Sequence, residues 1–241
     1  MSRAVALQRL GRASLLALLG LGCACCTGSI FTSKTAPPSL YLLRADLAGS
    51  AAAAAVGAVP PGAMAPRDAI VPADLTIRHP RVRGGLDTNR IAVLFADRRL
   101  DYFANARWSG PLDQVVQDLT LQAFTTGAQL RNVSADSSAF PAGFWLEIDV
   151  DAFQAEYAPM VSAPTVYVHL LARLGAVADR RILGSFDATS RQTSADNRLT
   201  AIVDAYERAA DAALTSIVAD TSRILGECSA MRNATACARS P

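Results

Sequence analysis

The stretch FWLEIDVDAF, residues 144–153, decides the fold, because apolar and polar side chains alternate along it. Successive side chains of a β-strand point to opposite faces, so every second residue from Phe144 to Val150 shares one apolar side. The other side carries Trp145 and three carboxylates, those of Glu147, Asp149 and Asp151. The alternation predicts a strand with one buried and one solvated face.

Two further strands are expected immediately after this one, over residues 165–174 and 181–189. Ala178 and Asp179 lie between them and are typical of a turn. Three strands in a row with short connections predict an antiparallel meander.

Helices are expected on both sides of the meander. Apolar residues recur every three or four positions over residues 198–225, which predicts a long amphipathic helix. A shorter helix is expected after Ser109-Gly110-Pro111, with Pro111 in its first turn, Ser109 as its cap and Gly127 at its end.

The remaining elements complete an α+β domain over residues 67–225. Strands are expected over residues 75–82, 90–95 and 99–103, the last two as a hairpin, and a short one over 129–133. Strands, helix, strands and helix in this order predict a mainly antiparallel sheet with two helices packed on one face.

Both flanks of this domain differ from it in composition. Residues 48–66 are rich in alanine, glycine and proline, which is typical of a linker, and a short strand is expected near residues 39–43. Residues 226–241 are expected to be a polar, irregular tail. Its Cys228 and Cys237 can form a local disulfide or stay as thiols, and their spacing does not favour a metal site.

The N-terminus has the pattern of a secretory signal over residues 1–22. Three arginines precede an apolar run at residues 13–22, which is too short to span a bilayer as a helix. The run ends at Cys23 and resembles a bacterial lipobox, in which the cysteine carries acyl chains such as palmitate. Gly20 stands where the lipobox has leucine, so Cys25 is an alternative lipid site, and an ordinary cleaved signal is a third reading.

The charge of the chain excludes one class of partner. The formal net charge is +2, but the signal segment holds three of the 23 basic residues and no acidic one. The rest of the chain has 20 basic and 21 acidic residues and is nearly neutral. This balance does not predict binding to nucleic acid.

Catalytic and metal-binding motifs are missing from the sequence. His79 and His169 are the two histidines, and no hydrolase, metalloprotease or nucleotide-binding pattern surrounds them, so we expect neither an enzyme nor a cofactor. The carboxylates of residues 147–151 can bind a cation, but we favour the solvated side of a sheet, balanced by Arg173 or Arg181. Trp108 can be an interface anchor or a core residue.

Several segments together resemble a known family. They are Tyr41-Leu42-Leu43, Leu86-Asp87 and, most distinctively, RWSGPL at residues 107–112, which leads into the first helix. With the order of elements, they resemble the auxiliary lipoprotein component of ABC-type lipid transport systems, the PqiC-like lipoproteins, over residues 39–225. Gly110 replaces the acidic residue that is usual in the family.

The resemblance implies a non-catalytic lipoprotein on the periplasmic face of the outer membrane, a location that Ala24 after Cys23 also favours. Its implied partners are an MCE-domain substrate-binding protein and an ABC permease and ATPase that move phospholipid or another hydrophobic substrate between membranes. The resemblance leaves open whether the protein forms a homo-oligomer. One alternative is a stand-alone periplasmic lipoprotein that binds a hydrophobic ligand. Another is an anchored hydrolase that depends on His79 or His169.

Overall fold

The structure is a computed structural model that describes residues 37–45, 70–139 and 141–232. The predicted signal segment, Cys23, Cys25, the predicted linker at residues 48–66 and Cys237 lie outside the described residues. The elements below all belong to one compact unit, Pro38–Pro241. They are β1 (Ser39–Tyr41), β2 (Val71–Ile77), β3 (Arg81–Val82), β4 (Arg90–Phe95), β5 (Leu100–Trp108), α3 (Leu112–Gly127), β6 (Leu130–Ala135), β7 (Phe144–Tyr157), β8 (Thr165–Ala176), β9 (Ile182–Thr193) and α4 (Leu199–Arg232).

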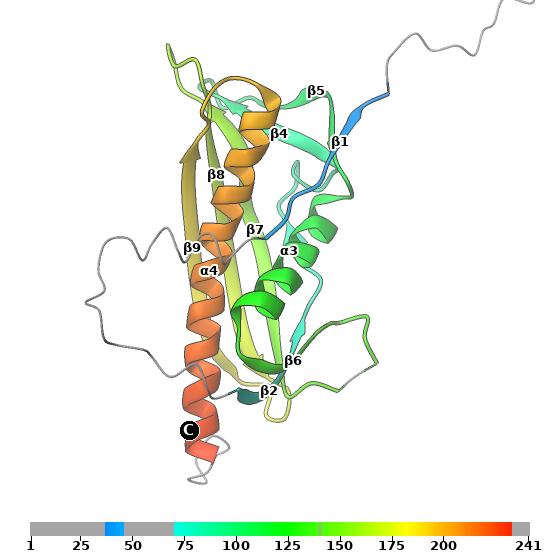
Figure 1. Cartoon of the computed structure of the whole chain (residues 1–241), viewed down its shortest axis with the longest axis vertical. Helices are drawn as coiled ribbons and strands as arrows, with labels where there is room; N and C mark the ends of the chain where they lie inside the picture. Colours follow the sequence, from blue (N-terminus) through cyan, green and yellow to red (C-terminus); the bar gives the residue numbers. More distant parts are fainter. Residues whose placement is uncertain (1–36, 46–69, 140, 233–241) are drawn as a thin grey trace, which may run out of the picture. The chain divides into compact units, whose positions relative to one another are not determined.

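Strand β7 organises the sheet (Figure 1). Along one edge it pairs antiparallel with β8, which pairs antiparallel with β9, as the predicted meander requires. Along its other edge three short strands follow one another, all parallel to β7: β2, then β3, then β4. A strand of 14 residues is long enough to hold all three partners.

The sheet is therefore mixed, and the prediction of a mainly antiparallel sheet is wrong. Besides the partners of β7, the pairs β1 with β5 and β2 with β6 are parallel. For the pairs of β2 with β6 and of β2, β3 and β4 with β7, the physical reason is helix α3, which lies in the chain between the earlier and the later partner and carries the chain back. Strands β1 and β5 are joined by the long segment between residues 41 and 100, which includes β2, β3 and β4. The predicted hairpin of β4 and β5 is confirmed as an antiparallel pair.

A β-bulge at Asp151 changes which side chains of β7 face the core. Val150 pairs with Leu170 and Ala152 with His169, so Asp151 is the extra residue on β7. Before the bulge the even-numbered residues are buried, and after it Phe153 and Ala155 are. The bulge lets β7 continue past the predicted end at residue 153 with its apolar residues still in the core.

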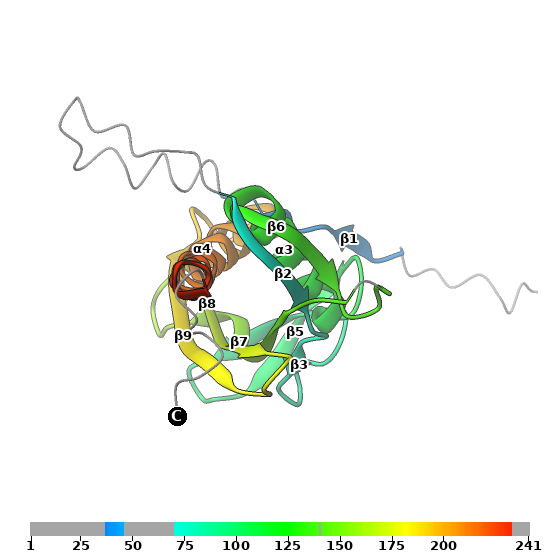
Figure 2. The same ribbon diagram turned by 90° about the horizontal axis from the view of Figure 1, so that it is seen from below.

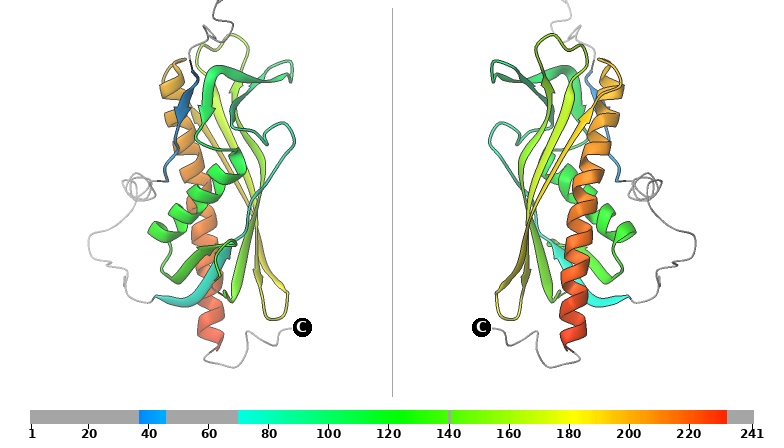
Figure 3. Two further views of the ribbon diagram at one scale, coloured as in Figure 1. Left: turned by 90° about the vertical axis from the view of Figure 1, so that its right-hand side faces the viewer. Right: turned by 90° about the vertical axis from the view of Figure 1, so that its left-hand side faces the viewer.

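Helix α4 lies along β8 and β9, where the Ile224 side chain comes close to Gly184 of β9. Figure 3 shows α3 and α4 on the same side of the long strands, and Figure 2 shows the curvature of the sheet, which brings β2 into contact with α4. Large rings fill the space between sheet and helix. Tyr206 of α4 contacts Trp108 and Phe153 at centroid distances of 5.1 and 5.3 Å.

The helix ends differ from the sequence-based expectations in two places. Pro111, not Ser109, is the N-cap of α3, and no side chain caps it; the Ser109 amide donates to the Tyr41 carbonyl oxygen instead. Helix α4 continues beyond Leu225 to Arg232, so this part of the predicted irregular tail is helical, and Cys228 is buried in it. Within the described residues, none of the helices is long and apolar enough to cross a membrane.

Candidate functional site

The face of β7, β8 and β9 that points away from α4 gathers most of the ionisable groups singled out in the sequence. We call it the polar face and define it by the side chains of Glu147, Asp149, Asp151, His169, Arg173 and Asp187. Cross-strand pairing places them side by side: Glu147 lies opposite Arg173, for example. The intervening residues of β8, such as Leu170 and Ala172, point to the core and are buried. Alternation along each strand thus builds the face.

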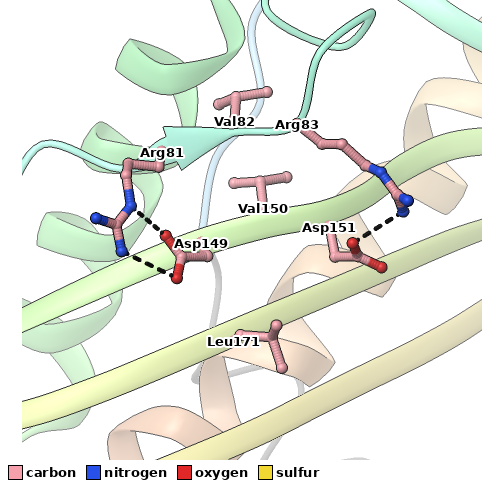
Figure 4. A pocket seen from close by; sticks show the side chains of 7 residues that line it. All are labelled: Arg81, Val82, Arg83, Asp149, Val150, Asp151 and Leu171. Atoms are coloured by element: carbon pink, nitrogen blue, oxygen red, sulfur yellow. Dashed lines mark hydrogen bonds and ion pairs between the residues drawn. The ribbon is translucent and has the colours of Figure 1, made fainter.

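Strand β3 and the residue that follows it supply two arginines to this face, Arg81 and Arg83 (Figure 4). The Arg81 guanidinium donates to both carboxylate oxygens of Asp149, at 2.7 and 3.2 Å. Arg83 donates to Asp151 at 2.9 Å. With Leu171 these side chains line a shallow depression of about 210 Å³. Parallel pairing of β3 with β7 creates the arrangement, because it sets Arg81 beside Asp149.

Glu147 is the least exposed carboxylate of the polar face and lies among three guanidinium groups. Its oxygens are 2.8 Å from Arg81, 3.7 Å from Arg173 and 3.9 Å from Arg78. Arg78 also stacks over the Trp145 indole ring, 4.0 Å from its centroid. Of the two cations expected to balance the carboxylates, Arg173 does so. Arg181 instead lies 3.6 Å from Asp179 in the turn after β8.

His169 bridges the three strands. Its Nδ1 lies 3.1 Å from an Asp151 carboxylate oxygen on β7, and its Nε2 lies 2.9 Å from an Asp187 oxygen on β9. Both ring nitrogens are therefore engaged by carboxylates. In this geometry the imidazole joins neighbouring strands and does not activate a hydroxyl or thiol nucleophile, which would need a free ring nitrogen.

The electrostatics of the polar face are those of paired charges. The hydrogen bond from Arg81, opposed by partial burial, lowers the pKa of the Asp149 carboxyl below its ordinary value. Guanidinium groups occupy the positions that a cation bound to these carboxylates would take. Among the described residues no cluster of histidine, cysteine, aspartate and glutamate could hold a metal ion. The face is the solvated side of the sheet, with strands aligned by ion pairs that are individually weak.

Arg81 and Arg83 were not identified from the sequence as partners of the carboxylates, although the sequence holds a signal for them. Arg81-Val82-Arg83 and Asp149-Val150-Asp151 carry the same spacing with opposite charge. The two segments are 68 residues apart, and nothing local indicates that they pair. A search for complementary charge patterns at period two would have matched them.

The other predicted site residues lie elsewhere. Trp108 is only 1% exposed, so the interface-anchor interpretation is wrong for this structure and the core interpretation holds. Its ring packs edge-on against both Phe153 and Tyr206, which stack on each other. His79 lies apart from the polar face, and its ring contacts Asp113 of α3 at 2.8 Å. Cys23, Cys25 and Cys237 are outside the described residues, so the acylation site and a bridge from Cys228 stay predictions.

Comparison with known proteins gives one family and a set of similar folds. The sequence matches the family model described as the ABC-type transport auxiliary lipoprotein component over residues 49–218. The crystal structure of protein XCC0632 from Xanthomonas campestris is similar with a TM-score of 0.64 and 22% identity, covering 82% of this chain and 99% of that one. The crystal structure of an uncharacterized protein has a TM-score of 0.54 and 14% identity, covering 78% and 98%. At such identities the structures show the fold alone. A search of curated proteins found no match.

Proposed function

The chain belongs to the family of ABC-type transport auxiliary lipoprotein components, and from this premise we propose that it is a non-catalytic, outer-membrane lipoprotein that serves an ABC/MCE-type lipid transport system. The family match over residues 49–218 is the observation that carries the proposal. It also confirms the resemblance first seen at residues 107–112. The anchor would be on Cys23, and the domain would stand on the periplasmic face of the membrane.

A non-catalytic role is supported by the state of the ionisable groups. Both nitrogens of His169 are held by carboxylates, and both nitrogens of His79 contact polar side chains of α3. On the polar face, Glu147, Asp149 and Asp151 lie within ion-pair distance of arginines, and Asp187 contacts His169. Groups held in this way join the strands and α3 to one another, which fits a domain that works by binding.

The proposed partners are an MCE-domain substrate-binding protein and the permease and ATPase of an ABC transporter. A transporter in the inner membrane needs a component that receives or organises its conduit at the other membrane, and a lipid-anchored auxiliary protein is suited to this place. The work would then be binding, with phospholipid or another hydrophobic molecule as the transported substrate.

The test is affinity purification of the acylated, tagged full-length protein from detergent-solubilised membranes. We expect MCE and ABC subunits to be recovered with it, and not with an unrelated outer-membrane lipoprotein that carries the same tag. Failure to recover any such subunit, also after chemical cross-linking in cells, would contradict the proposal. Phospholipid bound to the purified protein without any partner would instead favour a stand-alone lipoprotein that binds a hydrophobic ligand.

A further inference from the structure

One end of the domain exposes apolar side chains on a protruding loop. This loop, residues 158–164, connects β7 to β8, and the turn at residues 96–99, between β4 and β5, lies beside it because Phe95 pairs with Tyr157. Met160 is fully exposed and Val161 is 52% exposed. We call the loop and the turn together the apolar end. The exposed Met160 side chain buries no apolar surface in the isolated domain, so it is available to contact a partner or a membrane.

Aromatic rings and arginines lie directly behind the tip. Phe95 stacks on Tyr157 at a centroid distance of 5.8 Å, and the Arg99 guanidinium lies 4.6 Å from the Phe95 ring centroid. Arg98 is exposed, and no described residue forms an ion pair with it. A membrane–water interface accommodates this arrangement of apolar residues at the tip, aromatic rings behind them and Arg99 beside the Phe95 ring.

The backbone holds this tip outward. Met160 has φ 61° and Arg98 has φ 65°, both in the left-handed region that side-chain-bearing residues seldom adopt. The Val161 amide donates to the Ala158 carbonyl oxygen and closes a turn around Met160. The loop is thus shaped so that the methionine side chain points away from the domain.

The chain enters the domain from this same end. Strand β1 is parallel to β5, and β5 begins at Leu100, next to the turn of the apolar end. The first residues of β1 are therefore directed toward the apolar end, and Figures 1 and 3 show the start of β1 and the β7–β8 loop at one end of the unit. Residues 24–38 separate Cys23 from the start of β1 at Ser39, and a chain of this length can reach at most about 50 Å.

We propose that the apolar end is a membrane contact: Met160 and Val161 insert into the headgroup region of the bilayer that holds the lipid anchor. The inference rests on the proposed acylation of the N-terminal cysteine. An apolar tip of this size would not bind a bilayer firmly alone, but an anchor keeps it at high local concentration, where a weak contact suffices to orient the domain. Arg99 is paired with Asp97 and Asp101, whereas Arg98 is left to face the headgroups.

The contact fixes which way the protein faces. With the apolar end on the membrane, the opposite end, formed by the β8–β9 turn and the C-terminal part of α4, is directed into the periplasm. An auxiliary protein held in this orientation offers a partner the polar face and the far end, and keeps the β7–β8 loop out of reach.

The experiment uses the full-length acylated protein in vesicles of phosphatidylethanolamine with brominated phosphatidylcholine, whose bromine atoms quench nearby tryptophan. The probe is Met160→Trp, and the control is Val177→Trp, because Val177 is exposed to the same extent as Val161 but lies in the turn after β8 at the opposite end. The unchanged protein gives the background, since Trp108 is buried and Trp145 pairs opposite Gly175 near that far end. We expect quenching at position 160 to exceed that of the control at least about twofold.

A second pair of variants separates insertion from mere proximity. Val161→Trp should be quenched, and adding Met160→Asp to it should remove the quenching while the protein still floats with the vesicles. Equal or absent quenching at positions 160 and 177 in floated protein overturns the membrane contact but leaves the proposed anchor standing. A protein that does not float overturns both. Recovery of transporter subunits is measured separately, so failure of that proposal is recognised independently.

Discussion

Trp108 is the side chain that links most of the structure around it. It ends β5, its amide donates to the Asn89 carbonyl oxygen, and its ring lies in the core with Phe153 of β7 and Tyr206 of α4. Burial raises the pKa of the Tyr206 hydroxyl, which donates to the Ala92 carbonyl oxygen at 2.7 Å and stays protonated. One ring cluster thus connects the hairpin, the long strand and the long helix.

We expect Trp108→Ala to destabilise the protein by about 3–5 kcal/mol, because it leaves a large cavity that three elements line. Urea unfolding followed by circular dichroism measures the change. Trp108→Phe is the matched control and should cost less, since it keeps a ring against Phe153 and Tyr206. Unchanged stability of Trp108→Ala together with loss of a binding partner would contradict the core role and restore the interface interpretation.

For single residues, the sequence could indicate which side chains matter but not which residues surround them. Tryptophan suits both a core and an interface, so the sequence alone left the role of Trp108 open. Arg173 was found because it sits in the neighbouring strand of the predicted meander, opposite Glu147. Arg81 was missed because its partner Asp149 is 68 residues away, and side-chain pairing over that distance leaves no local mark.

Among the elements, β7 was the most predictable and its parallel neighbours were the least predictable. Strict alternation over residues 144–150 locates the strand, and short turns identify β8 and β9 as its antiparallel continuation. The strand predicted over residues 75–82 is divided in the structure into β2 and β3, and β4 matches the strand predicted over residues 90–95. What places all three on β7 is tertiary packing after α3. Local patterns reveal hairpins because the chain itself joins the partners, whereas parallel pairs need a crossover.

Three elements meet at His79, which lies in the link between β2 and β3. Its ring contacts Asp113 and Gln117 of α3, at 2.8 and 3.3 Å, and its amide donates to Asp136, just after β6. The hydrogen bond to Asp113 raises the pKa of His79 above its ordinary value, and burial opposes the rise. The charged imidazole therefore helps to hold α3 against the sheet.

This contact makes stability depend on pH in a defined direction. Because the folded-state pKa is raised, the stabilisation is fully present below about pH 6.5 and is lost as pH rises through the raised value. We expect His79→Gln to lower the free energy of unfolding by about 0.5 kcal/mol at about pH 5.5, a size typical of exposed pairs, and hardly at all at about pH 9. Urea unfolding at both pH values measures it. An equal loss at both would show that the charge is irrelevant.

For the molecule as a whole, the decisive physical question is what holds it at a membrane. None of the described helices can cross one, and the family is one of lipoproteins. Anchoring would then depend on acyl chains at the N-terminal cysteine, each buried methylene contributing about 0.8 kcal/mol. The sequence limits the choice to Cys23 and Cys25.

We expect Cys23→Ser to move the protein from the membrane fraction to the soluble periplasmic fraction and to abolish its labelling by palmitate, because removal of the acylated thiol removes the anchor. Cell fractionation and metabolic labelling measure both effects. Cys25→Ser is the matched control and should leave the protein anchored. The opposite pattern, with Cys25→Ser alone detaching the protein, would assign the lipid to Cys25.

The three parallel partners along one edge of β7 also affect how the protein reaches its native state. The elements β7, β8, β9 and α4 are consecutive in the chain, so their contacts close short loops and should form early. Strands β2, β3 and β4 are separated from β7 in the chain by β5, α3 and β6. Their pairing with the remaining edge of β7 therefore closes long loops, which slows their docking. Until they dock, that edge is open to aggregation with other chains, and a holding chaperone during export would protect it.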